Sequence, residues 1–372
     1  MSNPVDRLNR YDGYLQQDPE NAVLAVEAFD LAFSLGLHAR AEAYLDQAQS
    51  LIGEDSYLQY RRASLWAAQE KWDDALALQA ELCQRFPEDA GLRSALASLL
   101  HHAGRYEEAE TIWSALQHGG SLPAHAWANR LRTLHFLGRL DEAMALGDAG
   151  ADTFTHLPQA AGVLSLVAVD AGKFERARYW SEIALNEMPD SAEALTAAGA
   201  LALASRDPGG AIKALSQVVC EKPQEGRAWS SLGIAHLLLQ DGEAASANFQ
   251  RAITLMPAHI GSWHGLGWAS MLTGDMVRAK ETFEKALALD RNFGESHGAV
   301  AVAYAFTGLR DQAKQHIELA LKLDAAGLSA RFAQAVLSGA VQRQEEFQAL
   351  VARALRGVEA PDGRSLIDWI RQ

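Results

Sequence analysis

The sequence has little cysteine, no long apolar run and fewer basic than acidic residues, and each shortage excludes a class of protein. Its two cysteines, Cys83 and Cys220, lie far apart, which excludes a disulfide framework and a thiolate metal site. No segment approaches the roughly 18 apolar residues of a membrane span, and the polar start MSNPVDRLNRYDG lacks the apolar core of a secretory signal. We therefore expect a cytoplasmic protein without membrane insertion.

The charge balance argues against a nucleic-acid partner. The formal net charge is −14, whereas binding to a phosphate backbone depends on Lys and Arg neutralising phosphates. Residues 1–55 carry ten acidic residues and three arginines, so half of the excess lies at the N-terminal end. This end is either a solvated cap or a docking surface for a basic partner.

Motifs of catalysis are also missing from the sequence. It contains no HExxH, no phosphate-binding glycine loop, no G-x-S-x-G and no CxxC. We therefore predict a protein that is not an enzyme and that has no catalytic residues, no cofactor and no metal.

What the sequence does contain is a repeat of 34 residues. The stretch GRYEEAE begins at Gly104, GRLDEAM begins at Gly138 and GKFERAR begins at Gly172. An alanine recurs at the same interval nine times without insertion, at Ala41, Ala75, Ala109, Ala143, Ala177, Ala211, Ala245, Ala279 and Ala313. We number each unit so that this alanine is position 20, and units then begin at residues 22, 56, 90, 124, 158, 192, 226, 260, 294 and 328.

The glycine pattern indicates that each unit is a helical hairpin. Position 15 is glycine in six of the first nine units, at Gly36, Gly104, Gly138, Gly172, Gly274 and Gly308. A glycine in the middle of a unit is typical of the end of one helix and the turn to the next. Positions 4, 7, 8 and 11 form one helical stripe, so the first helix (helix A) buries this stripe against the second (helix B). Small residues at positions 8 and 20 allow the two backbones to approach closely.

The best-preserved units, at 226 and 260, identify the family. The first has Trp229, Leu232 and Gly233 in helix A, and then Ala245, Phe249, Ala252 and Pro257. The second repeats this pattern, with Arg291 where the proline is expected. The pattern resembles the tetratricopeptide repeat family, in which W-x2-L-G-x2-Y is followed by A-x3-F, A and P. The resemblance implies an all-α fold, a right-handed α-solenoid or superhelix of about ten helix-turn-helix repeats, and a non-catalytic scaffold or adaptor that binds proteins.

The ends of the chain depart from the pattern. Residues 1–21 are predicted to be an N-terminal half-repeat whose single helix caps the first unit, and residues 22–327 the nine repeats. Residues 328–357 are a degenerate tenth repeat, with Phe347 at position 20. Residues 358–372 include Leu366, Ile367, Trp369 and Ile370, and are either a capping helix or a tail that docks on a partner or in the chain's own groove.

A binding groove is expected on the other face of the A helices. Positions 2, 5, 6, 9, 12 and 13 point roughly opposite to the buried stripe, and the resemblance implies that this side is concave. The candidate peptide-binding residues are Tyr60, Arg61, His101, Asn129, Arg132, His135, Ser230, His264 and Trp268. Asn129 and Arg132 would be the directional groups for a peptide's carboxylate, backbone or side-chain amides, and Trp268 the anchor.

Each candidate has a structural alternative. The polar residues could be ordinary solvated surface, and Trp268 could be wedged between repeats. The apolar groove residues of the middle units could receive an extended or helical apolar segment, or else Leu166, Val169 and Leu203 could be buried between neighbouring A helices. The histidines do not suggest a metal site, because His125 and His135 lie about 15 Å apart along one helix. We therefore expect a protein or peptide partner, with a homo-oligomer joined through its ends, or a sensor of a small peptide or metabolite, as alternatives.

Overall fold

The computed structural model describes residues 3–339, and within them the chain has 21 helices and no strand. The helices belong to two compact units, residues 1–189 and 190–372, which are described separately. The all-α architecture that the 34-residue period predicts is confirmed. The expected helix B of the tenth repeat and the segment 358–372 lie outside the described residues.

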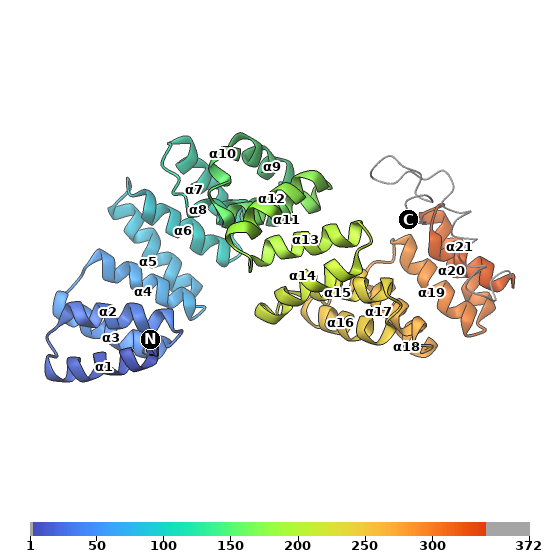
Figure 1. Ribbon diagram of the computed structural model, residues 1–372, viewed down its shortest axis with the longest axis horizontal. Coiled ribbons are helices and arrows are strands. Elements are labelled where there is room, and N and C mark those ends of the chain that lie inside the picture. The colour runs from blue at the N-terminus through green and yellow to red at the C-terminus, as the bar shows by residue number, and fades with distance from the viewer. Residues whose placement is uncertain (1–2, 340–372) are drawn as a thin grey trace. The chain divides into compact units, whose positions relative to one another are not determined.

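The first unit begins with α1 (Pro4–Gln17), which buries Leu8, Tyr11 and Leu15 and packs against α2. Five helical hairpins follow (Figure 1). Their helices are α2 (Ala22–Ser34) and α3 (His38–Ile52), α4 (Ser56–Ala68) and α5 (Trp72–Arg85), α6 (Ala90–His102) and α7 (Tyr106–His118), α8 (Ala126–Phe136) with α9 (Leu140–Ala149) and α10 (Ala151–Phe154), and α11 (Pro158–Asp170) and α12 (Phe174–Glu187).

The second unit continues the same succession with four hairpins and one further helix. These are α13 (Ala192–Ala204) and α14 (Pro208–Glu221), α15 (Gly226–Leu238) and α16 (Gly242–Leu255), α17 (Ile260–Leu272) and α18 (Met276–Leu289), α19 (Gly294–Phe306) and α20 (Arg310–Leu323), and finally α21 (Leu328–Leu337). Every helix A of the nine hairpins ends at position 13 and every helix B begins at position 17, so the hairpins keep one register.

The turn between the two helices explains the glycines at position 15. All six of these glycines have positive φ, between 69° and 83°. In the hairpin of α2 and α3, the Leu37 N–H donates to the Ala32 carbonyl and the Gly36 N–H to the Phe33 carbonyl. This left-handed ending satisfies carbonyls that a helix otherwise leaves open at its C-terminus.

Close packing of the two helices accounts for the small residues. The nine alanines at position 20 are all completely buried. At position 8, a Cβ added to Gly233 would lie 2.8 Å from the ring of Phe249, at position 24 of the same repeat. Because real Cβ atoms do not approach other atoms so closely, the aromatic ring fits only against a glycine.

The tryptophan at position 4 forms a hydrogen bond with the preceding repeat. The indole Nε1–H of Trp229 donates to the Pro223 carbonyl at 2.9 Å, and that of Trp263 to the Pro257 carbonyl at 2.8 Å. Where the sequence departs from the pattern, His297 replaces the tryptophan and its Nε2 lies 3.0 Å from the carbonyl oxygen of Arg291, which stands in place of the proline. The contact is therefore kept although both residues differ.

The last described helix packs differently from the other A helices. Of the two helices of the preceding repeat, α17 and α19 contact mainly helix B, whereas α21 contacts mainly helix A, which is α19. Gly298 of α19 permits this approach, since a Cβ there would come within 2.7 Å of the Ala330 backbone nitrogen. At the other end of α21, the Arg310 guanidinium donates to the Leu337 carbonyl at 2.7 Å.

Candidate functional site

Several polar candidates of the first unit contact other residues on neighbouring A helices. Arg61 on α4 makes two hydrogen bonds with the Asp30 carboxylate on α2, at 2.9 and 2.8 Å. This geometry is the bidentate pairing that guanidinium and carboxylate groups favour, and it raises the pKa of Arg61. Tyr60, one residue earlier, is 40% exposed, so it presents its ring to solvent beside an arginine that already has a partner.

Asn129 and Arg132 on α8 form a pair. The Arg132 guanidinium donates to the side-chain oxygen Oδ1 of Asn129 at 2.9 Å, and the side-chain amide of Asn129 donates to the Ser98 hydroxyl on α6 at 3.4 Å. The two directional groups predicted for a peptide therefore have partners within the free protein. A ligand would have to replace these contacts.

The two histidines at position 12 have different surroundings. His101 is 92% buried (8% exposed) and its Nδ1 lies 2.7 Å from the Thr133 hydroxyl. Burial, with smaller contributions from the charges of His102 and Arg132, lowers the pKa of His101 to about 4. His135 is partly exposed, and its Nε2 lies 2.6 Å from the Asp170 carboxylate on α11.

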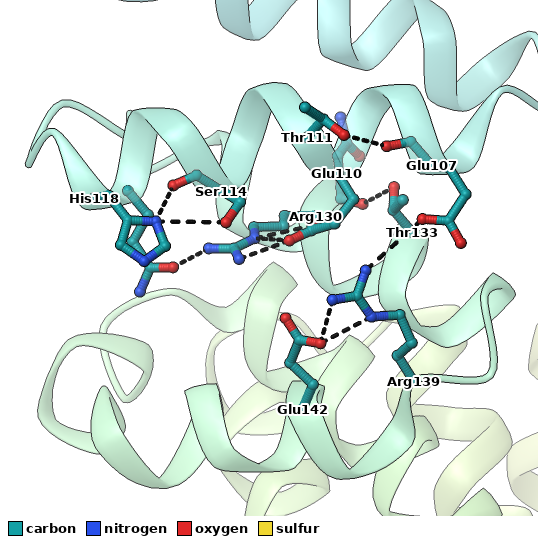
Figure 2. A network of polar contacts seen from close by, with 11 residues as sticks. Glu107, Glu110, Thr111, Ser114, His118, Arg130, Thr133, Arg139 and Glu142 are labelled. Atoms are coloured by element: carbon teal, nitrogen blue, oxygen red, sulfur yellow. Dashed lines mark hydrogen bonds and ion pairs between the residues drawn. The ribbon is translucent and has the colours of Figure 1, made fainter.

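The first unit also holds a buried ion pair that the sequence analysis did not identify. Figure 2 shows Arg130 of α8 reaching Glu110 of α7. The side chains are 2% and 4% exposed, and the Arg130 Nη2 donates to Glu110 at 2.7 Å. The Gln117 side chain accepts a further hydrogen bond, and the guanidinium lies 5.8 Å from the centre of the Trp127 ring. Arg130 stands at position 7 of the buried stripe, which is leucine in four other repeats, and a charged residue at this position was the available signal.

The polar candidates of the second unit are buried between successive A helices. The Ser262 hydroxyl on α17 donates to the Ser230 hydroxyl on α15 at 3.0 Å. His264 is 9% exposed, its Nε2 lies 2.9 Å from the Ser296 hydroxyl on α19, and its ring stacks on Phe293. Burial lowers the pKa of His264 to about 4, so this histidine is neutral at pH 7.

Trp268 is covered by the chain's own aromatic residues. Its ring lies 5.2 Å from that of Phe283 and 6.3 Å from that of Phe332 on α21. Phe332 also contacts Phe306 of α19, with the ring centres 6.1 Å apart. The A-helix surface at Trp268 therefore receives an aromatic side chain from a helix that follows two repeats later.

The apolar candidates of the middle repeats are mostly buried. Within the first unit, Val163 is 1% exposed and Leu166 and Val169 are partly buried. Within the second unit, Ala197 is completely buried and Thr196 is 8% exposed. These residues are therefore packed inside their own units rather than open to a partner, as the alternative of burial between helices predicted for some of them.

Exposed apolar side chains do occur on the A helices of the second unit. Leu238 of α15, Leu272 of α17 and Phe306 of α19 all stand at position 13, and Ile234 stands one helical turn before Leu238. These four residues, which we name the apolar stripe, are each 44–46% exposed. Equivalent positions of successive repeats lie side by side in a repeat protein. Position 13 is among the positions predicted to face away from helix B, but its apolar character in three successive repeats was not predicted.

The stacked hairpins define a helical-repeat protein, and the comparisons with known proteins identify its family. Models of the tetratricopeptide repeat match residues 67–128, residues 163–225 and 196–260, and residues 260–293. The chain belongs to the tetratricopeptide repeat family, as its sequence pattern predicts. Proteins of this family are generally non-catalytic scaffolds that bind protein partners.

One solved structure supports the fold, and two others are similar to part of the chain. The chain is similar to one from the crystal structure of the APC/C hetero-tetramer Cut9-Hcn1, with 16% identity and a TM-score of 0.61 over 80% of this chain and 59% of that chain. A MamA crystal structure has 26% identity and a TM-score of 0.39 over 42% of this chain and 92% of that one. PilF of Pseudomonas aeruginosa has 21% identity and a TM-score of 0.44 over 54% and 92%. No curated protein matches the sequence significantly.

Helix length bears on membrane association. Among residues 3–339, no helix is both long enough and apolar enough to cross a bilayer.

Proposed function

We propose that the protein is a scaffold that binds a helical segment of a partner protein on the apolar stripe of its second unit. The observation that carries the proposal is the exposure of large apolar side chains at position 13 of three successive A helices, with a fourth, Ile234, one helical turn before Leu238. Aligned apolar residues on a folded surface are typical of an interaction site, whereas scattered ones are not.

The packing of α21 supports a helix as the occupant. This helix already lies along α19 and places Phe332 against Trp268 and Phe306. A partner helix that crosses the A helices, with apolar residues spaced by three, four and seven positions, could contact them in succession, because seven residues of helix advance about 10 Å. Packed helices are about 8–10 Å apart, so such spacing suits the side chains of successive repeats.

Most of the polar candidates have a structural role in this proposal rather than a role in binding. Arg61, Asn129, His101 and His264 have partners on neighbouring helices, so we propose that they fix the A helices relative to one another. Tyr60 is the candidate of the first unit that offers exposed area to a partner.

A peptide-display selection tests this proposal without knowledge of the natural partner. The intact protein is used to select from a library of 20-residue random peptides, and we expect enrichment of sequences with apolar residues at i, i+3 or i+4, and i+7. The enriched peptides are then measured against the Leu238→Gln/Leu272→Gln variant, which should bind at least tenfold more weakly.

A matched variant controls for the loss of exposed apolar area. Leu289 and Leu319 are 45% and 43% exposed on the B helices α18 and α20, so Leu289→Gln/Leu319→Gln removes similar area away from the stripe. Its affinity should equal that of the wild type. Equal binding by all three proteins would place the site elsewhere.

A further inference from the structure

The chain carries a second apolar segment that fits the stripe. Residues 365–372 read SLIDWIRQ. At 100° per residue, Leu366, Ile367, Trp369 and Ile370 share one face of a helix, while Asp368 and Arg371 fall on the opposite face. The sequence therefore predicts a short amphipathic helix with an aromatic residue at its centre.

This segment begins within reach of the stripe. The described chain ends at Gly339, two residues after α21, whose Phe332 contacts Phe306 of the stripe. Twenty-six residues, 340–365, separate Gly339 from Leu366, and a chain of that length can reach at most roughly 85 Å. The outer helices of the stripe, α15 and α19, are two helix spacings or roughly 20 Å apart.

We propose that residues 365–372 bind intramolecularly to the apolar stripe and compete there with the partner. The inference rests on the proposed function, because it assigns an internal occupant to the same surface. Trp369 would pack against Leu238 and Leu272 in the same way that Phe332 packs against Trp268 and Phe306. A tethered segment has an effective concentration near the millimolar range, so weak contact suffices to occupy the surface.

The test uses a labelled synthetic peptide, DGRSLIDWIRQ, and fluorescence anisotropy with full-length proteins. In the Trp369→Ala/Ile370→Ala variant the tethered segment can no longer bind, so we expect the peptide to bind this variant at least tenfold more tightly than the wild type. Adding Leu238→Gln/Leu272→Gln to that variant should abolish binding, whereas adding Leu289→Gln/Leu319→Gln should not. Circular dichroism melting confirms that each protein is folded.

Two results would overturn the inference. One is equal peptide affinity for the wild type and the Trp369→Ala/Ile370→Ala variant, or no binding to either. The other is a molecular mass that rises with concentration for the wild type and not for that variant, since the segment would then bind a second copy. The peptides selected by display separate this failure from failure of the proposed function: if they still require Leu238 and Leu272, the stripe binds partners and only the internal occupant is wrong.

Discussion

Three turns of the solenoid contain a residue poorly suited to its backbone, and replacing it should stabilise the protein. Position 15 has positive φ in all nine hairpins, yet three of them have no glycine there: Glu70, Arg206 and Gln240 have φ of 61°, 56° and 59°. Gln240 is exposed, and the turn is held by backbone groups, with the Asp241 N–H donating to the His236 carbonyl at 2.9 Å. Gln240→Gly should keep these hydrogen bonds and remove the steric conflict.

The expected gain follows from two opposing contributions. A left-handed conformation costs a residue with a Cβ about 1–2 kcal/mol. Glycine loses more backbone entropy on folding than other residues, and this loss reduces the gain from removing the Cβ by about 0.5–1 kcal/mol. The net increase in the free energy of unfolding should therefore be about 0.5–1 kcal/mol for Gln240→Gly, and similar for Glu70→Gly in the first unit.

Urea unfolding at equilibrium measures the change, with Gln240→Ala as the control. The alanine variant also loses the side chain but keeps the Cβ, so its midpoint should stay close to that of the wild type. The reverse substitution, Gly274→Ala, should lower stability by a similar amount, because a Cβ there has no atom within 4 Å and meets only the unfavourable φ of 83°. Equal midpoints for Gln240→Gly and Gln240→Ala would refute the reasoning.

Three further predictions concern the core and the buried polar groups. Ala177→Leu should overpack the completely buried contact between α11 and α12 and cost about 1–3 kcal/mol, so an unchanged melting midpoint would contradict the packing. Arg130→Ala should cost about 3–5 kcal/mol because it leaves Glu110 buried without its partner, whereas Arg130→Met with Glu110→Leu should come close to wild type in the same denaturation assay. Burial lowers the folded pKa of His264 to about 4, against about 6.5 when unfolded. The contribution of His264 to the free energy of unfolding should therefore be constant above pH 6.5 and fall as the pH drops from there towards 4, and in the same assay His264→Gln should lose less stability than the wild type between pH 7.5 and 5.

The helical hairpins could be predicted from the sequence because each repeat obeys local rules. The alanine at position 20 and the glycine at position 15 fix where two helices meet and where the chain turns, and both act within one repeat of 34 residues. The same register marks Glu70, Arg206 and Gln240 as turn residues, although nothing in their own chemistry indicates a left-handed backbone.

The candidate site could be predicted only in part. Helical geometry selects the positions that face away from helix B, and these include all nine candidates. It does not show which of them meet across repeats, as His101 meets Thr133 and His264 meets Ser296, each 32 residues apart. That separation is two residues short of the period of 34, because residues that meet between adjacent helices lie on opposite sides of them, and two residues turn a helix by about 200°.

By itself, the sequence determined the class of fold, the register of the hairpins and the family, because these depend on periodic spacing along the chain. Only the tertiary structure decided which side chains are available to a partner. It placed Phe332 over Trp268, buried Arg130 against Glu110 and left Leu238 and Leu272 exposed. Exposure depends on what lies against a residue in space, and the helix that covers Trp268 begins 60 residues further along the chain, at Leu328.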